Sequence, residues 1–182
     1  MRNLQEIAID KSIAIKKLQF KKNWVEYFDS FITAFILISL IIFSYFLYFF
    51  EINYENKNDR FMAFVVLPII VLFSIYMIYR QFTEFNLKKI ETKLNKNLLH
   101  QSIIDFARST EFKILKNSKN CIIIEKPKLN PINVKIVILF PIDNCIYYTM
   151  INDSYKLNSP IVISHLLFAR DLKNWLVENE NK

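Results

Sequence analysis

The chain of 182 residues contains no glycine at all. Glycine lets a backbone loop approach a phosphate closely, because it carries no Cβ atom and adopts positive φ angles without strain. The sequence therefore excludes a Walker phosphate-binding loop, a dinucleotide-binding fingerprint and the glycine-flanked nucleophile elbow of many hydrolases.

Cysteine and histidine are scarce, with only Cys121, Cys145, His100 and His165 in the chain. Structural zinc sites use closely spaced ligand pairs, and no two of these residues are close in sequence. Nothing local activates either thiol as a nucleophile. Each cysteine lies in an apolar run that is typical of a buried strand, and in a cytosolic setting both thiols are reduced. We expect no metal, no cofactor and no catalytic residue.

Three carboxylates, Asp143, Asp153 and Asp171, lie in predicted turns or at predicted helix starts. Turn and capping roles explain such positions better than acid–base catalysis does.

Long hydrophobic runs are abundant. Residues 30–50 and 61–79 contain no charged side chain, and a ten-residue linker, 51–60, separates them. At about 1.5 Å per residue each run spans about 30 Å, the thickness of the hydrocarbon core of a bilayer. Neither run has the polar stripe of a surface helix. The first is too long for a signal peptide and lacks a small-residue cleavage site. The pattern predicts transmembrane helices over about 28–50 and 61–80, which form a hairpin over 25–80.

Lysine and arginine near the ends of the spans predict the orientation. The flank before the first span carries five, the linker two, and the flank after the second span five. We therefore expect both termini in the cytoplasm, and a multi-pass protein of the bacterial inner membrane. These residues are Lys11, Lys16, Lys17, Lys21, Lys22, Lys57, Arg60, Arg80, Lys88, Lys89, Lys93 and Lys96.

The spans also suggest how the hairpin behaves. Neither core holds an ionisable residue, which argues against a proton relay or an ion pathway. Pro68 is expected to kink the second helix. The small residues Ser30 and Ala34, together with Ser39 and Ser44, favour association of the hairpin with itself or with another helix.

Residues 1–24 read as a basic amphipathic segment, helical over 3–24. Leu4, Ile7, Ala14 and Leu18 fall near one side, and five lysines supply positive charge. One interpretation is a helix that lies on the anionic cytoplasmic leaflet, and the other is a solvated helix. Nucleic-acid binding is not expected, because the basic residues are not interleaved with aromatic ones.

Residues 81–182 predict a cytoplasmic α+β domain with two layers. A juxtamembrane helix is expected to continue from Arg80 to about residue 108, since no proline or glycine interrupts it. Four strands follow, over 112–116, 121–125, 134–140 and 145–152, and form an antiparallel sheet. A final helix lies between Ser164 and Asn179, with an apolar face made by Leu172, Trp175 and Leu176.

The residues from about 106 to the C-terminus carry a weak family pattern. Its matching parts are Ile122–Pro127, Lys135–Phe140, Asn144–Ile151 and Leu167–Asn174. This pattern resembles a family of uncharacterised small bacterial membrane proteins, and the resemblance implies no known activity. Where that pattern has tryptophan and glycine after the proline, this chain has Lys128-Leu-Asn-Pro131.

Three hypotheses of function remain. The first is a non-enzymatic accessory protein, anchored in the inner membrane, which presents its cytoplasmic domain to a protein partner. The second is a membrane-tethered immunity protein that neutralises a toxin by binding it. The third is an enzyme that acts on lipid or peptide at the membrane surface.

Overall fold

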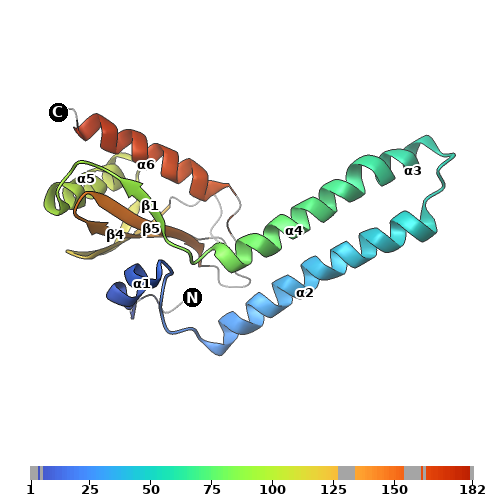
Figure 1. Ribbon diagram of the computed structural model, residues 1–182, viewed down its shortest axis with the longest axis horizontal. Coiled ribbons are helices and arrows are strands. Elements are labelled where there is room, and N and C mark those ends of the chain that lie inside the picture. Colours follow the sequence, from blue (N-terminus) through green and yellow to red (C-terminus); the bar gives the residue numbers. More distant parts are fainter. Residues whose placement is uncertain (1–3, 5, 127–133, 154–160, 162, 181–182) are drawn as a thin grey trace. The chain divides into compact units, whose positions relative to one another are not determined.

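The computed structural model describes residues 4, 6–126, 134–153, 161 and 163–180. The chain divides into two units (Figure 1). One, the helical hairpin, comprises residues 24–83. The other, the sheet domain, comprises residues 1–23 together with 84–182. The loop after Pro127, where the family pattern differs, lies outside the described residues.

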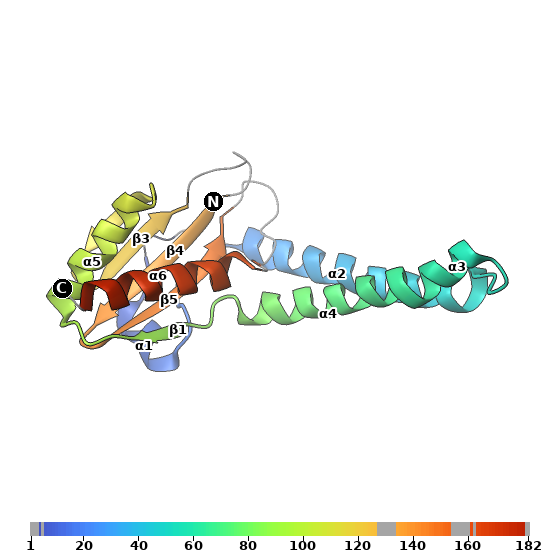
Figure 2. The same cartoon turned by 90° about the horizontal axis from the view of Figure 1, so that it is seen from above.

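The helical hairpin consists of two long antiparallel rods that run side by side (Figures 1 and 2). The first rod is α2 (Trp24–Phe46), which widens into a π-helical turn, Leu47–Glu51. The second is α3 (Lys57–Phe61), a π-helical turn, Met62–Val66, and α4 (Leu67–Thr83). Rods of 28 and 27 residues are long and apolar enough to cross a bilayer. In each rod, only 17% of the apolar 18-residue stretch is buried, whereas the core helix of a soluble protein is mostly buried.

One seam joins the two rods. Its buried residues are Asp29, Thr33, Leu37 and Ser44 from α2, and Ala63, Leu67, Ser74 and Arg80 from the second rod. Many are small, which lets two helices approach closely. Gln81 Nε2 donates a hydrogen bond to the carbonyl oxygen of Ser30 and so fixes the register at one end. Of the small residues in α2, Thr33 and Ser44 are buried in the seam, whereas Ser30 and Ser39 are exposed.

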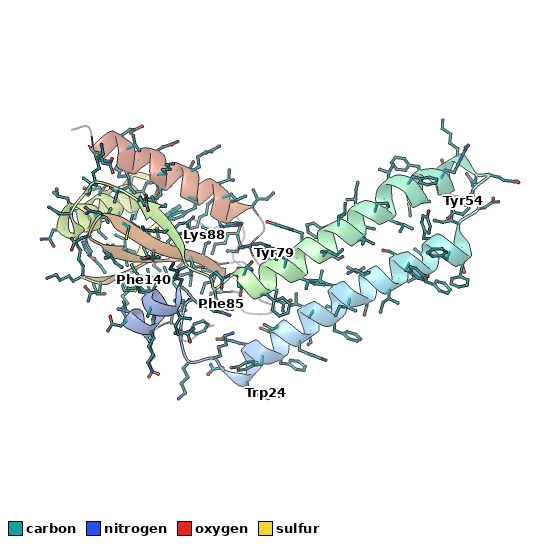
Figure 3. The ribbon with its side chains drawn as sticks, viewed as in Figure 1. Trp24, Tyr54, Tyr79, Phe85, Lys88 and Phe140 are labelled. Atoms are coloured by element: carbon teal, nitrogen blue, oxygen red, sulfur yellow. The ribbon has the colours of Figure 1, made fainter. Side chains whose placement is uncertain are left out.

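At the other end, the linker makes a hydrogen-bonded turn. The Tyr54 hydroxyl donates to the carbonyl oxygen of Tyr48 at 2.9 Å (Figure 3). Asn56 caps α3 by accepting the N–H of Asn58. Pro68 is the second residue of α4, which begins immediately after the π-helical turn Met62–Val66. Because proline has no N–H and its ring crowds the carbonyl four residues earlier, a widened turn at this point accommodates it.

In the part of the chain that the structure describes, the sheet domain contains five antiparallel strands in the order β1-β5-β4-β3-β2. Four match the expected strands: β2 (Lys113–Ser118), β3 (Cys121–Glu125), β4 (Lys135–Ile142) and β5 (Cys145–Asn152). The final helix is also confirmed, as α6 (Ser164–Glu180). Asn144 turns the chain between β4 and β5 with a φ of 62°, a conformation that asparagine tolerates well.

The expected continuous helix from Arg80 to residue 108 is wrong. The chain leaves α4 at Thr83, forms the edge strand β1 (Lys88–Glu91) and begins α5 (Lys96–Ser109) after the N-cap residue Asn95. Leu87 and Ile90 have helical spacing, yet they are buried in different clusters. Residues three apart in an extended chain point to opposite faces, and here both faces are covered.

The sheet domain has three layers rather than the expected two, with the sheet in the middle. Helices α5 and α6 cover one face, where Leu99, Ile103 and Leu172 pack on Ile122 and Leu139. The opposite face buries a second cluster under the N-terminal segment. It contains Leu18, Phe85, Leu87, Cys121, Ile123, Ile136, Ile138, Phe140 and Ile151. Strands β3 and β4 are apolar on both faces, as strands with two covered faces must be.

The N-terminal segment is not one helix over 3–24. Among the described residues before Trp24, α1 (Ile9–Ile15) is the helical part, and Lys16 ends it with a φ of 54°. Ile7, Ile9, Ile13 and Phe20 pack against the second cluster. These apolar side chains cover the sheet, so they are not the membrane-facing side of a helix lying on a leaflet.

Residues 16–18 pair with residues 85–87. We call the stretches 16–22 and 84–87, which contain this pairing, the neck. The Leu18 N–H donates to the Phe85 carbonyl at 2.8 Å, and the Leu87 N–H donates to the Lys16 carbonyl at 2.9 Å. The rings of Phe20 and Phe85 lie 5.5 Å apart (Figure 3 labels Phe85). The Thr149 hydroxyl on β5 donates to the Glu84 carbonyl at 2.6 Å. The neck is thereby tied to the sheet.

Replacing Leu18 by alanine tests this packing. Leu18 is 3% exposed, and a buried leucine-to-alanine change costs about 2–5 kcal/mol. Cys121 lies in the same cluster, so in a Cys145→Ala background the thiol of Cys121 should be alkylated much faster in Leu18→Ala. The matched control is Lys17→Ala, whose side chain is exposed. Equal alkylation rates in the two variants would contradict the packing.

Candidate functional site

A polar pocket of about 300 Å³ lies on the sheet domain. Its lining residues are Lys96, Asn97 and His100 from α5 and Asn117 and Lys119 from the end of β2 and its turn. We call it the cationic pocket. Of these residues, only His100 was considered as a site residue from the sequence. The five are brought together by the packing of α5 beside the end of β2, which the sequence pattern does not reveal.

The two walls of the cationic pocket are held by hydrogen bonds. Asn95 Oδ1 accepts the Leu98 N–H at 3.0 Å, and Asp143 Oδ1 accepts the Lys96 N–H at 3.0 Å. These bonds fix the first turn of α5 against the turn between β4 and β5. Lys96 Nζ donates to Asn120 Oδ1 at 2.7 Å and so joins α5 to the turn after β2.

The lining of the cationic pocket sets its chemistry. Two ammonium groups and two amides provide donors and positive charge, and no carboxylate lines the pocket. Such a surface suits a small oxyanion rather than a metal cation. The Nε2 atom of His100 is buried and has no hydrogen-bond partner in the described structure.

The two cysteines lie apart in the sheet domain, and both thiols are buried. Burial raises the pKa of the Cys121 thiol to about 11, and the nearby Lys116 offsets only part of this effect. Burial also raises the pKa of the Cys145 thiol, again with a smaller opposing effect from Lys89. Near neutral pH both groups are thiols rather than thiolates, which are the reactive form.

The histidines and cysteines do not converge. In the described ranges, no three His, Cys, Asp or Glu side chains lie close enough together to hold a metal ion. Cys121 belongs to the cluster under the N-terminal segment, while His165 is buried on α6. That the chain holds no metal remains a prediction.

The three carboxylates have separate surroundings. Asp143 accepts the first N–H of α5, and Asp171 forms an exposed ion pair with Arg170 at 3.2 Å. Asp153 is buried, and its N–H donates to the Val134 carbonyl at 2.7 Å. They do not form the closely spaced pair that acid–base chemistry on one substrate requires.

The helical hairpin has a groove of its own, of about 420 Å³. It lies beside Pro68 and is lined by Ile41, Ser44, Tyr45, Tyr48, Phe49, Leu67, Pro68, Val71 and Leu72. Nearly all of these side chains are apolar or aromatic. The groove suits a hydrocarbon chain or a neighbouring helix.

Comparison with protein-family models, with curated proteins and with solved structures finds no match to this chain.

The raised pKa of Cys121 predicts a pH dependence of stability. A thiol whose pKa rises from 9.0 in the unfolded chain to about 11 in the folded one favours folding below pH 9. That contribution is lost as the pH rises toward 11. We expect the free energy of unfolding of the parent protein to fall between pH 9 and 10.5 relative to that of Cys121→Ala. Urea unfolding of the detergent-solubilised full chain, followed by Trp175 fluorescence in a Trp24→Phe background, measures this. A constant difference across that range would contradict it.

Proposed function

We propose that the protein is a non-enzymatic, membrane-anchored interaction protein of the bacterial inner membrane. The helical hairpin spans the bilayer, and the sheet domain is presented in the cytoplasm to a protein partner. The observation that carries this proposal is the pair of rods of 28 and 27 residues with most of their apolar surface uncovered.

The side chains on the outside of the hairpin support membrane insertion. Phe31 is 67% exposed, Phe50 72% and Leu72 67%. Monomeric soluble proteins rarely expose apolar surface this extensively, since contact with water is unfavourable. A bilayer removes that penalty, and the helices satisfy their own backbone hydrogen bonds.

The sheet domain supports a binding role rather than a catalytic one. Its thiols are buried with raised pKa values, and no carboxylate is among the described residues that line its cationic pocket. Near the start of α6, Ile163, Leu166 and Leu167 are 61%, 55% and 41% exposed. Leu166 and Leu167 are three and four residues after Ile163, a spacing that places all three on one side at the start of the helix. Such a patch on a folded domain is typical of a protein-binding surface.

Reporter fusions test the membrane topology. A reporter fused after Lys182 should show cytoplasmic activity, because the flanks of both spans are lysine-rich. A reporter inserted beside Asn56, in the turn before α3, should show the opposite pattern. Alkaline extraction should leave the full chain in the membrane fraction. The reverse reporter pattern would contradict the orientation, and release by alkali would contradict insertion.

We further propose that the hairpin associates in the membrane, with itself or with another helix. The uncovered groove beside Pro68 and the aromatic stretch after Ser44 offer a packing surface, and packing rather than hydrophobicity drives helix association in lipid. Mass measurement of the full chain in mild detergent, with crosslinking in membranes, tests this. Replacing Val71 and Leu72 in the groove by alanine should weaken the association, while Phe31→Ala, outside the groove, should not. A strict monomer without crosslinked products would contradict it.

A further inference from the structure

Lysines are concentrated in one short stretch beside the first span. Residues 11–25 contain five lysines and no carboxylate. Four of the lysines, Lys16, Lys17, Lys21 and Lys22, fall within seven residues and end two residues before α2 begins at Trp24. All four are exposed. We call them the neck lysines.

The fold holds the neck lysines in place. Lys16 accepts the Leu87 N–H through its carbonyl, and Lys17 lies opposite Asn86 in the neck. Between them and Lys21, the buried Leu18 anchors the chain on the sheet. Lys22 Nζ lies 4.5 Å from the centroid of the Phe85 ring. The backbone positions of these charges are therefore set before any partner binds, which reduces the entropy lost on binding.

The segment carries a local excess of positive charge. Residues 11–25 contain five lysines and no carboxylate, and Glu6 and Asp10 lie before them along the chain. Lys16, Lys17 and Lys21 are exposed, so their ammonium groups face the surroundings of the domain.

We propose that the neck lysines bind the headgroups of anionic phospholipids. This inference depends on the proposed insertion of the hairpin, which brings the residues just before Trp24 to the headgroup level. The proposed binding is mainly electrostatic, since most large apolar side chains of this segment cover the sheet, while Ile15 is 63% exposed. Lysine beside a bilayer attracts anionic lipid electrostatically, and the effect weakens as salt screens it.

A lipid surface fits these observations better than a nucleic acid does. The aromatic rings nearest the lysines are Phe20 and Phe85, which pack against each other. They therefore do not provide the exposed stacking platform that single-stranded nucleic acids need.

Trp24 provides a direct probe. It is 78% exposed and is the first residue of α2. In a Trp175→Phe background Trp24 is the only tryptophan, and circular dichroism checks that the fold is retained. The full chain is reconstituted in phosphatidylcholine vesicles that contain either brominated phosphatidylcholine or brominated phosphatidylglycerol, whose bromines quench nearby tryptophan. We expect roughly fivefold preferential quenching by the anionic lipid at low salt, and less at high salt.

Two triple variants make the test specific. The first replaces Lys16, Lys17 and Lys21 by glutamine and should abolish the preference. The second replaces Lys93, Lys113 and Lys173 by glutamine; these lysines are exposed elsewhere on the sheet domain and do not line the cationic pocket. It makes the same change in net charge and should retain the preference.

The other outcomes separate the two proposals. Equal quenching by the two brominated lipids, or equal loss of preference in both variants, overturns lipid binding by the neck lysines and leaves membrane insertion standing. Absence of quenching by either lipid contradicts insertion itself, and with it this inference.

Discussion

Two backbone hydrogen bonds, from Leu18 to Phe85 and from Leu87 to Lys16, join the segments that precede and follow the hairpin. They fix the points where the chain leaves and re-enters the sheet domain next to each other. The sheet domain is consequently built from residues on both sides of the hairpin in the sequence, and the hairpin, residues 24–83, is an insertion between them along the chain. A break in this pairing would leave one face of the sheet without its cover.

The apolar character of the strands explains why that cover is needed. In β4, Val137 and Leu139 face α5 and α6, while Ile136, Ile138 and Phe140 face the N-terminal segment. Burial of such side chains contributes about 1.5–3 kcal/mol each. The N-terminal segment therefore serves the domain first through its apolar residues. Its lysines Lys16, Lys17 and Lys21 lie on the exposed side, and the lipid binding proposed above would use them.

The sequence predicted the parts of this structure that depend on local pattern. The two spans follow from long uncharged runs, and strands β2 to β5 and helix α6 follow from β-branched runs, turn residues and helical spacing. Strand β1 was missed because Leu87, Ile90 and Leu94 have the spacing of a helix, and only the tertiary contact with β5 selects the extended form. The sequence did contain an indication of the third layer, because the runs 121–124 and 136–140 do not alternate between apolar and polar residues. Such runs indicate strands that are covered on both faces.

The candidate sites were harder to predict for the same reason. Lys96 and Lys119 belong to a helix and a turn whose contact depends on the whole sheet, and neither stands out in a sequence where lysine is abundant. The sequence shows the neck lysines as a cluster, but it does not show that their backbone pairs with residues 85–87. A helical interpretation put Leu18 on the membrane side, whereas the structure buries it against Phe85.

Hydrogen exchange at two amides tests the central claim most directly, that residues 16–18 and 85–87 form one paired element of the sheet domain. In the full chain, the N–H groups of Leu18 and Leu87 should exchange about as slowly as those of central strand β4, since each is hydrogen-bonded and each residue is at most 8% exposed. Exchange of both amides at the rate of an unprotected chain, while β4 stays protected, would show that the N-terminal segment is not part of the folded domain.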